Sequence, residues 1–218
     1  MRSSKLALLA LAALTLALPD ASRARAGDRK EAPVPASTTM SMPAVGQTAP
    51  DFTLPSTTGK AVTLSQLKGK SVVLYFYPKD ETPGCTREAC DFRDAAQRLT
   101  SRKAVVLGVS PDSLKSHESF RDKFGLPFLL LSDADHKVAG AYGAWVKKTM
   151  YGREYMGIER STFVIGPDGM VKAVFRKVKV DGHVDEVLAV VASQGGLAAA
   201  RPPGAGAAGV LRQRPRRG

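Results

Sequence analysis

Cysteine, histidine and tryptophan are scarce in this sequence of 218 residues, which contains two Cys, three His and one Trp. Two cysteines are too few for a disulfide-rich mini-protein, and a structural zinc site needs four ligands, whereas no histidine lies near the cysteines in sequence. A glycine-rich phosphate loop, a haem-attachment motif and a basic surface interleaved with aromatic residues are also lacking. The sequence therefore predicts no metal, no organic cofactor and no nucleic-acid partner.

The apolar segment near the start of the chain is too short to span a bilayer. The run Leu6–Leu18 falls below the about 20 residues that a membrane-spanning helix needs. It follows Arg2 and Lys5 and precedes an A-x-A sequence at 24–26, which together are typical of a cleavable export signal. We expect cleavage near Ala26, no stable membrane span afterwards, and a periplasmic or secreted protein. An uncleaved anchor or a misassigned start of translation is the alternative.

The net charge of +12 is concentrated at the two ends of the chain. Residues 1–26 carry a net +3 and residues 201–218 carry +5, which leaves +4 for the residues between them, so a polyanion partner is not indicated. Residues 27–45 are expected to form a flexible leader, and 195–218 a disordered tail rich in Gly, Ala and Arg. We expect the arginines of the tail to be solvated, with contact to an anionic lipid or polymer as the alternative.

Residues 46–194 alternate strand-like and helix-like patterns, which predicts one α/β domain with parallel crossovers. The continuously apolar Ser71–Tyr77 indicates a central strand that is covered on both faces. Gly166–Gly169 is typical of a turn, and predicts a hairpin of strands 162–165 and 170–177. Further strands are expected at 103–110 and 126–131, a leading hairpin at 51–54 and 61–64, a helical turn at 64–67, helices at 86–99, 113–124, 133–142 and 183–192, and a long loop at 143–159.

The segment Tyr75–Cys90 carries the reactive chemistry. A buried strand ends, a loop with Pro83 and Gly84 follows, and Cys85 falls in the first turn of an expected helix. The unpaired N–H groups and the positive dipole end of a helix start stabilise a thiolate, which is the nucleophilic form of cysteine. The Thr82 hydroxyl can donate and accept hydrogen bonds nearby. We expect a nucleophilic cysteine that acts on a small, polar substrate.

Cys90 lies five residues after Cys85 on the same expected helix. Helix geometry then separates the two Cα atoms by about 8.6 Å, whereas a disulfide needs Cα atoms within about 7 Å. Either the bridge is permanent and the segment is not helical, or the pair cycles between thiols and disulfide and the first helical turn unwinds each time. A bridge over so short a loop stabilises a fold by only about 2 kcal/mol, which favours cycling.

Pro78, Thr82 and Cys85 form the pattern P-x-x-x-T-x-x-C, which resembles the active-site motif of the peroxiredoxins. The spacing to Cys90 resembles their bacterioferritin-comigratory (Q-type) subfamily. This resemblance implies a single domain with a thioredoxin-like fold, in which helices flank a central mixed β-sheet, and thiol peroxidase activity. Further landmarks of that subfamily follow in order across residues 46–194, at Gly46–Phe52, Leu74–Pro78, Leu131–Asp133 and Gly157–Phe163.

The resemblance also implies roles for individual residues. Cys85 would be the peroxidatic cysteine, and Cys90 the resolving cysteine that forms an intramolecular disulfide with it. Pro78 and Thr82 would shield and hydrogen-bond Cys85, and Arg160 would be the distant active-site arginine. The substrates would be H₂O₂ and organic hydroperoxides, the reductant a thioredoxin or similar dithiol, and the protein a monomer or weak dimer. The export signal and the Arg-rich tail depart from the subfamily pattern and leave the reductant and the compartment open.

Two other functions remain open from the residues alone. One is an exported thiol-disulfide oxidoreductase that acts on proteins, although such enzymes typically use a C-x-x-C motif, which this chain lacks. The other is a non-catalytic binding module on a thioredoxin-like scaffold, held by a permanent bridge between the two cysteines.

Histidines and aromatic residues give weaker signals. His117, His136 and His183 are expected on surface helix faces rather than at a catalytic centre. Phe76 and Tyr77 are expected to pack within their strand. We expect three further aromatic residues to pack in the core or in loops: Tyr142, Trp145 and Tyr155. The alternative is that they line an entrance for the hydroperoxide.

Overall fold

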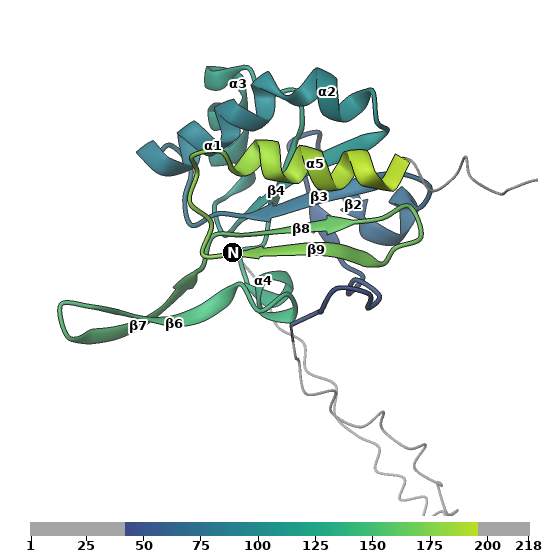
Figure 1. Ribbon diagram of the computed structural model, residues 1–218. Helices are drawn as coiled ribbons and strands as arrows, with labels where there is room; N and C mark the ends of the chain where they lie inside the picture. Colours follow the sequence, from purple (N-terminus) through teal and green to yellow (C-terminus); the bar gives the residue numbers. More distant parts are fainter. Residues whose placement is uncertain (1–41, 196–218) are drawn as a thin grey trace, which may run out of the picture. The chain divides into compact units, whose positions relative to one another are not determined.

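A five-stranded mixed sheet forms the centre of the computed structural model, which describes residues 42–195 (Figure 1). The expected export signal, the leader up to residue 41 and the tail from residue 196 lie outside the described residues. The strand order is β5-β4-β3-β8-β9. The strands are β3 (Ser71–Phe76), β4 (Ala104–Ser110), β5 (Leu129–Ser132), β8 (Ser161–Ile165) and β9 (Val171–Arg176).

The central position of β3 confirms the strand predicted from its apolar run. Every residue of β3 is buried, and the strand pairs in parallel with β4 and antiparallel with β8. β4 pairs in parallel with β5, and β8 forms the expected hairpin with β9. A strand with neighbours on both sides and cover on both faces needs apolar residues throughout.

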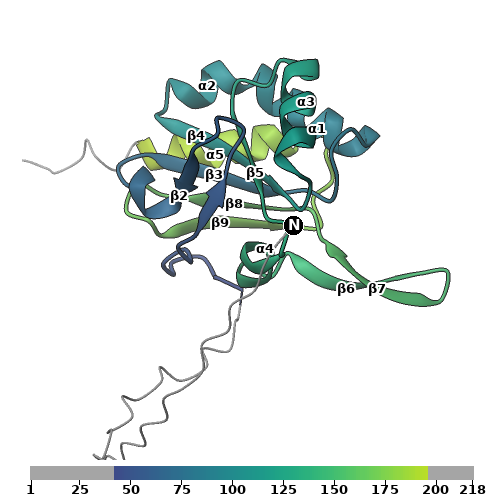
Figure 2. The ribbon, with the colours of Figure 1, turned by 180° about the vertical axis from the view of Figure 1, so that it is seen from behind.

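Helices cover one face of this sheet and smaller elements cover the other (Figures 1 and 2). The predicted α/β architecture is therefore confirmed. On the first face lie α1 (Pro83–Asp94), α2 (Ala96–Thr100), α3 (Leu114–Phe124) and α5 (His183–Gly195); on the second lie α4 (Lys137–Ala141), β1 (Thr53–Pro55), β2 (Ala61–Thr63) and the 3₁₀ helix η1 (Leu64–Leu67).

The prediction of a long loop at 143–159 is wrong, because this segment is an antiparallel hairpin of β6 (Trp145–Met150) and β7 (Arg153–Ile158). It turns at Tyr151 and Gly152, which both have positive φ, at 50° and 75°, and such a pair matches the twist of the flanking strands. The hairpin extends away from the sheet (Figure 1), and most of its residues are at least partly exposed. Without a buried face, its residues do not alternate between apolar and polar types.

The prediction of a single helix at 86–99 is also wrong. The observed helix begins earlier, at Pro83, and a break at Ala95 divides it into α1 and α2. Pro83 occupies the first turn, where its missing N–H costs no hydrogen bond. Neither glycine nor proline marks the break, and the apolar periodicity continues through it, so the sequence does not reveal it.

At the two ends of the described range, Met42 of the expected leader packs on the second face of the sheet and α5 continues to Gly195. Within residues 42–195, none of the helices has both the length and the apolar character to cross a membrane.

Candidate active site

Cys85 lies in the first turn of α1, as the sequence predicts. Thr82 is the N-cap residue, and its carbonyl oxygen accepts the first helical hydrogen bond from the N–H of Thr86 at 2.8 Å. The cysteine is only 1% exposed, and its thiol is free. The residue therefore lies beside the unpaired N–H groups and the positive dipole end of a helix start, which favour a nucleophilic sulfur even at this buried position.

Arg160 brings a positive charge to this sulfur. It directly precedes β8, and its Nη2 donates to Sγ of Cys85 at 3.3 Å. The guanidinium also lies against Gly84, where a Cβ atom would be 3.4 Å from Nη2, at the limit of ordinary van der Waals contact. Burial lowers the pKa of Arg160, but the charges of Glu88 and Cys85 outweigh it and raise the pKa above the ordinary value. The guanidinium is therefore a fixed positive charge beside Cys85.

Glu88 is the second partner of Arg160, and the sequence alone does not predict this role. Its side chain is fully buried one turn after Cys85, and its Oε2 accepts from Nη1 of Arg160. Burial raises the pKa of Glu88 to about 7, against the lowering effect of Arg160. Oε1 of Glu88 and the hydroxyl of Tyr75 are both buried without a hydrogen-bond partner among the described residues. The sequence does contain one signal for this role: Glu88 is an acidic residue among the apolar residues of the buried face of α1.

Thr82 and Pro78 lie in the loop between β3 and α1. Pro78 is exposed and Thr82 is half-buried. The Thr82 hydroxyl donates to the carbonyl oxygen of Lys79 at 3.1 Å, so in this conformation it ties the loop to itself. Shielding by Pro78 and a hydrogen bond from Thr82 to the reacting groups stay predictions.

Cys90 is half-buried and lies on the same continuous helix as Cys85. Both thiols are free in this conformation. The expected five-residue helical spacing is therefore present, and it keeps the two Cα atoms about 8.6 Å apart. A disulfide between them requires part of α1 to unwind, because the bond needs Cα atoms within about 7 Å.

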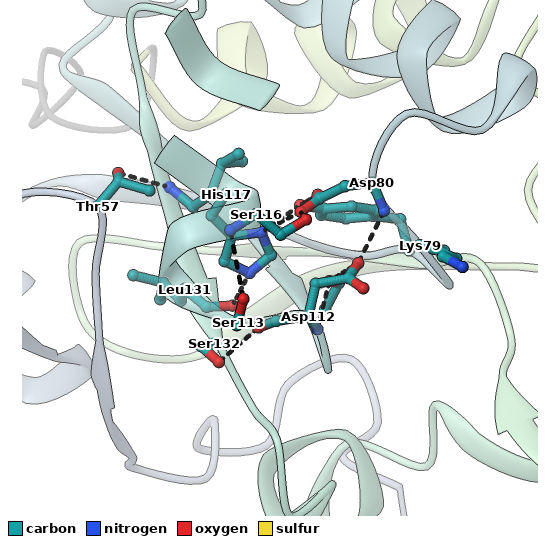
Figure 3. A network of polar contacts seen from close by, with 12 residues as sticks. Thr57, Lys79, Asp80, Asp112, Ser113, Ser116, His117, Leu131 and Ser132 are labelled. Carbon is teal, nitrogen blue, oxygen red and sulfur yellow. Dashed lines mark hydrogen bonds and ion pairs between the residues drawn. The ribbon is translucent and has the colours of Figure 1, made fainter. Parts of the chain in front are cut away.

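A buried polar network lies beside the loop and was not predicted (Figure 3). Its centre is Asp80, which accepts hydrogen bonds from the Tyr77 hydroxyl at 2.7 Å and from the Ser116 hydroxyl at 2.7 Å. His117 Nδ1 lies 2.8 Å from Oδ2 of Asp80. Burial raises the pKa of Asp80, but the contacts with His117, Ser116 and Tyr77 outweigh it, and the pKa is lowered.

The expectation of surface positions is wrong for His117 and His183, which are both buried. A buried imidazole needs hydrogen-bond partners, and local sequence does not reveal those of either residue. His183 Nε2 lies 2.8 Å from the hydroxyl oxygen of Thr162, and burial, with the charge of Arg160, lowers the pKa of His183 to about 4. His136 is half-buried and stacks on Trp145.

The aromatic residues pack largely as expected. Phe76 and Tyr77 are buried at the end of the central strand. Tyr142 is buried in the second apolar cluster, where its hydroxyl donates to the carbonyl oxygen of Pro50 at 2.8 Å. Tyr155 is exposed on the β6–β7 hairpin. Among residues 42–195, no group of three or more His, Cys, Asp or Glu side chains is placed to hold a metal ion.

Comparisons with known proteins agree with this geometry. Residues 45–174, which include both cysteines and Arg160, match the AhpC/TSA family. The peroxiredoxin Bcp of Bacillus subtilis is 55% identical over 144 residues, which cover 66% of this chain and 92% of that protein.

Solved structures give the same result. Peroxiredoxin Q of Xanthomonas campestris matches with a TM-score of 0.64 and 44% identity, over 66% of this chain and 91% of that one. A structure of the bacterioferritin comigratory protein of Xanthomonas campestris, studied for its alkyl peroxide reduction activity, also matches with a TM-score of 0.64 and 44% identity, over 66% and 92%. The chain therefore belongs to the AhpC/TSA family, and its thioredoxin-like fold and its relatives identify it as a peroxiredoxin of the Bcp type, a thiol peroxidase.

Proposed function

We propose that Cys85 is the peroxidatic cysteine and Cys90 the resolving cysteine of this thiol peroxidase. One observation carries the assignment: the buried Cys85 thiol at the start of α1 accepts a hydrogen bond from Arg160 at 3.3 Å. Cys90 is more exposed and has no comparable position at a helix start. The two sulfurs therefore differ in the way that a nucleophile and a resolving partner should.

In the first step, the Cys85 thiolate attacks the distal oxygen of the hydroperoxide. The O–O bond breaks, Cys85 becomes a sulfenic acid, and the leaving oxygen takes a proton to give water or an alcohol. Arg160, with Thr82, would bind the two peroxide oxygens. Donors aimed at the oxygen that gains negative charge lower the barrier because they bind the transition state better than the ground state.

In the second step, Cys90 reacts with the sulfenic acid on Cys85. The first turn of α1 unwinds, the Cys90 thiolate attacks Sγ of Cys85, the S–O bond breaks, and water leaves once the hydroxide has taken a proton. An external dithiol then reduces the disulfide through a mixed disulfide and is itself oxidised. The proposed donor is a thioredoxin or a similar dithiol protein.

The proposed substrates are H₂O₂ and organic hydroperoxides. Alkyl peroxide reduction is the activity for which the Xanthomonas campestris relative was studied. A thiolate that attacks the terminal oxygen of a hydroperoxide does not contact the hydrogen or alkyl group on the leaving oxygen, so both kinds of substrate can react. We also propose that the protein acts as a monomer or weak dimer.

Single-cysteine variants test the assignment. Wild-type protein should lose two free thiols with one equivalent of H₂O₂, whereas Cys85→Ser should lose none rapidly and show no turnover. Cys90→Ser is the matched control: it should accept one oxidation, leave a sulfenic acid that dimedone traps, and fail to turn over with a dithiol. Full dithiol-driven turnover in Cys85→Ser would overturn the assignment.

Export is a separate proposal that rests on residues 1–26. We propose that this segment directs the protein out of the cytoplasm and is cleaved near Ala26, so that the reductant must be a dithiol on that side of the membrane. Fractionation of cells that express the full chain should place a shortened product outside the cytoplasm. A variant without residues 2–26 should remain inside, and equal location of the two proteins would refute export.

A further inference from the structure

Asp80 is the inward-facing residue of the loop that connects β3 to α1. Its neighbours Lys79 and Glu81 are exposed, whereas Asp80 is 5% exposed. Oδ1 accepts from the Tyr77 hydroxyl at 2.7 Å, and Oδ2 accepts from the Ser116 hydroxyl at 2.7 Å. The N–H of Asp80 also donates to Oδ2 of Asp112 at 2.7 Å. The carboxylate and the backbone N–H of Asp80 are therefore both hydrogen-bonded to buried or half-buried side chains (Figure 3).

His117 connects this carboxylate to the sheet. The ring is 0% exposed on α3, and Nδ1 lies 2.8 Å from Oδ2 of Asp80. Nε2 lies 3.2 Å from the carbonyl oxygen of Leu131 on β5, and because a carbonyl oxygen only accepts, Nε2 carries a hydrogen and donates. The chain of contacts from the loop through Asp80 and His117 thus ends on the edge strand of the central sheet.

The chain immediately after Asp80 is held much less firmly. Glu81 has φ of 57°, a left-handed conformation that is strained for a residue other than glycine. Its carboxylate pairs with Lys123 at 2.7 Å, and both side chains are substantially exposed, so the ion pair adds little stability. A firmly held residue is therefore followed directly by a strained, weakly held one.

The junction between the firmly held Asp80 and the weakly held Glu81 lies just before the segment that must unwind in the proposed disulfide step. The first turn of α1 must unwind for Cys85 to reach Cys90, and afterwards Cys85 must return to Arg160. We propose that Asp80, with His117, is a positioning residue that fixes the loop end of the moving segment, so that unwinding begins at Glu81 and is reversed after each cycle. This inference rests on the proposed roles of Cys85 and Cys90.

The two half-reactions should respond in opposite directions when the anchor is weakened. Peroxide attack needs Cys85 in the folded position beside Arg160, and disulfide formation needs the unwound state. Asp80→Asn keeps the shape of the side chain but loses the charge and one acceptor. Because hydrogen bonds to a charged carboxylate are stronger than those to a neutral amide, we expect sulfenic acid formation to slow by about 10-fold and disulfide formation to accelerate.

Rapid quench and mass spectrometry measure both rate constants at one pH, with H₂O₂ as the oxidant. Ser116→Ala removes one donor to Asp80 and should change both rate constants in the same directions by about 3-fold; it decides the question alone if Asp80→Asn does not fold. Tyr142→Phe is the control. It loses one partly buried hydrogen bond on the opposite face of the sheet, and should leave the ratio of the two rate constants unchanged even if it lowers the melting temperature.

Opposite changes in the two rate constants would support the positioning role. Unchanged rate constants in Asp80→Asn, or equal losses in both that match its unfolded fraction, would overturn the inference while the proposed function stands. Failure of the proposed function has a different signature: wild-type protein would then form no sulfenic acid on Cys85 and no Cys85–Cys90 disulfide, and the inference would fall with it.

Discussion

Arg160 serves two buried partners with one guanidinium group. Nη2 faces Sγ of Cys85, and Nη1 donates to Glu88. A buried carboxylate needs a hydrogen-bonded, charged partner, and a planar guanidinium satisfies it while directing a second N–H elsewhere. Glu88 thereby fixes the direction in which Arg160 points at the sulfur.

Arg160→Lys separates the charge of this residue from its geometry. Lysine keeps the positive charge but cannot direct two fixed N–H groups at two partners, so we expect the rate constant of Cys85 oxidation by H₂O₂ to fall by about 100-fold. Competition kinetics against a reference peroxidase measures it. Arg153→Lys on the exposed hairpin is the control and should have no effect. A rate constant within about 2-fold of wild type in Arg160→Lys would show that charge alone suffices.

Glu88 and His183 give stability opposite dependences on pH. The folded pKa of Glu88 is raised to about 7 from 4.5, so its contribution to stability is fully present below about pH 4.5 and is lost as pH rises through 7. The folded pKa of His183 is lowered to about 4 from 6.5. Protonation of His183 therefore favours the unfolded state, and stability rises with pH between about 4 and 6.5. The two effects oppose each other between about pH 4.5 and 6.5.

Glu88→Gln should reveal the contribution of His183. Glutamine keeps an acceptor for Arg160 but does not ionise, so the free energy of unfolding should rise steeply from pH 4 to 6.5 and stay flat to pH 8. At pH 8 the variant should be more stable than wild type by up to about 3 kcal/mol. Urea unfolding at pH 5, 6, 7 and 8 measures this, with exposed Glu186→Gln as the control. The same pH profile in Glu88→Gln and wild type would contradict the assignment.

At the scale of elements, the sequence predicts those that bury an apolar face. β3 is apolar throughout because it is covered on both sides, and α5 buries a regular apolar stripe. The β6–β7 hairpin has little buried surface, so its pairing depends on backbone hydrogen bonds and on the turn at Tyr151 and Gly152. Periodicity cannot report an element of that kind. It also does not report the break at Ala95, because Phe92, Ala95 and Leu99 are all buried in the same cluster and the apolar pattern runs through the break.

The stability of the first turns of α1 should set the rate of disulfide formation. Thr86 is a half-buried residue between the two cysteines. Alanine favours a helix over glycine by about 1 kcal/mol, so Thr86→Gly should form the disulfide about 5-fold faster than Thr86→Ala. Rapid quench and mass spectrometry on both variants measure this step after oxidation by H₂O₂. The two variants control for each other, and equal rates would show that unwinding of α1 does not limit the step.

At the scale of the whole molecule, the sheet order explains which site residues the sequence reveals. The carboxyl ends of β3, β4 and β5 lie at one edge of the sheet, where Tyr77, Asp112 and Ser132 follow or end these strands. Because β8 runs antiparallel to β3, Arg160 at its start reaches the same edge. Cys85 could be found from its helix start, and Arg160 from a family landmark. Asp80 and His117, 37 residues apart, meet only through this topology, so local sequence gave no signal for them.

The positive charge of the molecule, which is concentrated at its two ends, should give only weak binding to anionic membrane surfaces. Residues 201–218 carry +5, and a basic residue at an anionic lipid surface contributes about 1 kcal/mol, so five of them give a dissociation constant of about 0.2 mM at best. The full chain should therefore sediment with anionic vesicles at low ionic strength and be released at about 0.15 M salt, where screening shortens the reach of charge. With residues 1–26 removed from every variant, a chain ending at residue 200 should not sediment in either case and should keep its peroxide turnover.

A variant with the five arginines replaced by lysine separates charge from specific recognition. It should behave like the full chain in both salt conditions, because lysine preserves the charge while losing the fork of N–H donors. Sedimentation of the full chain that persists at about 0.15 M salt and is lost in the lysine variant would contradict a purely electrostatic tail. In that case the arginines would recognise a ligand by geometry, and the tail would belong to the function of the enzyme rather than to its solubility.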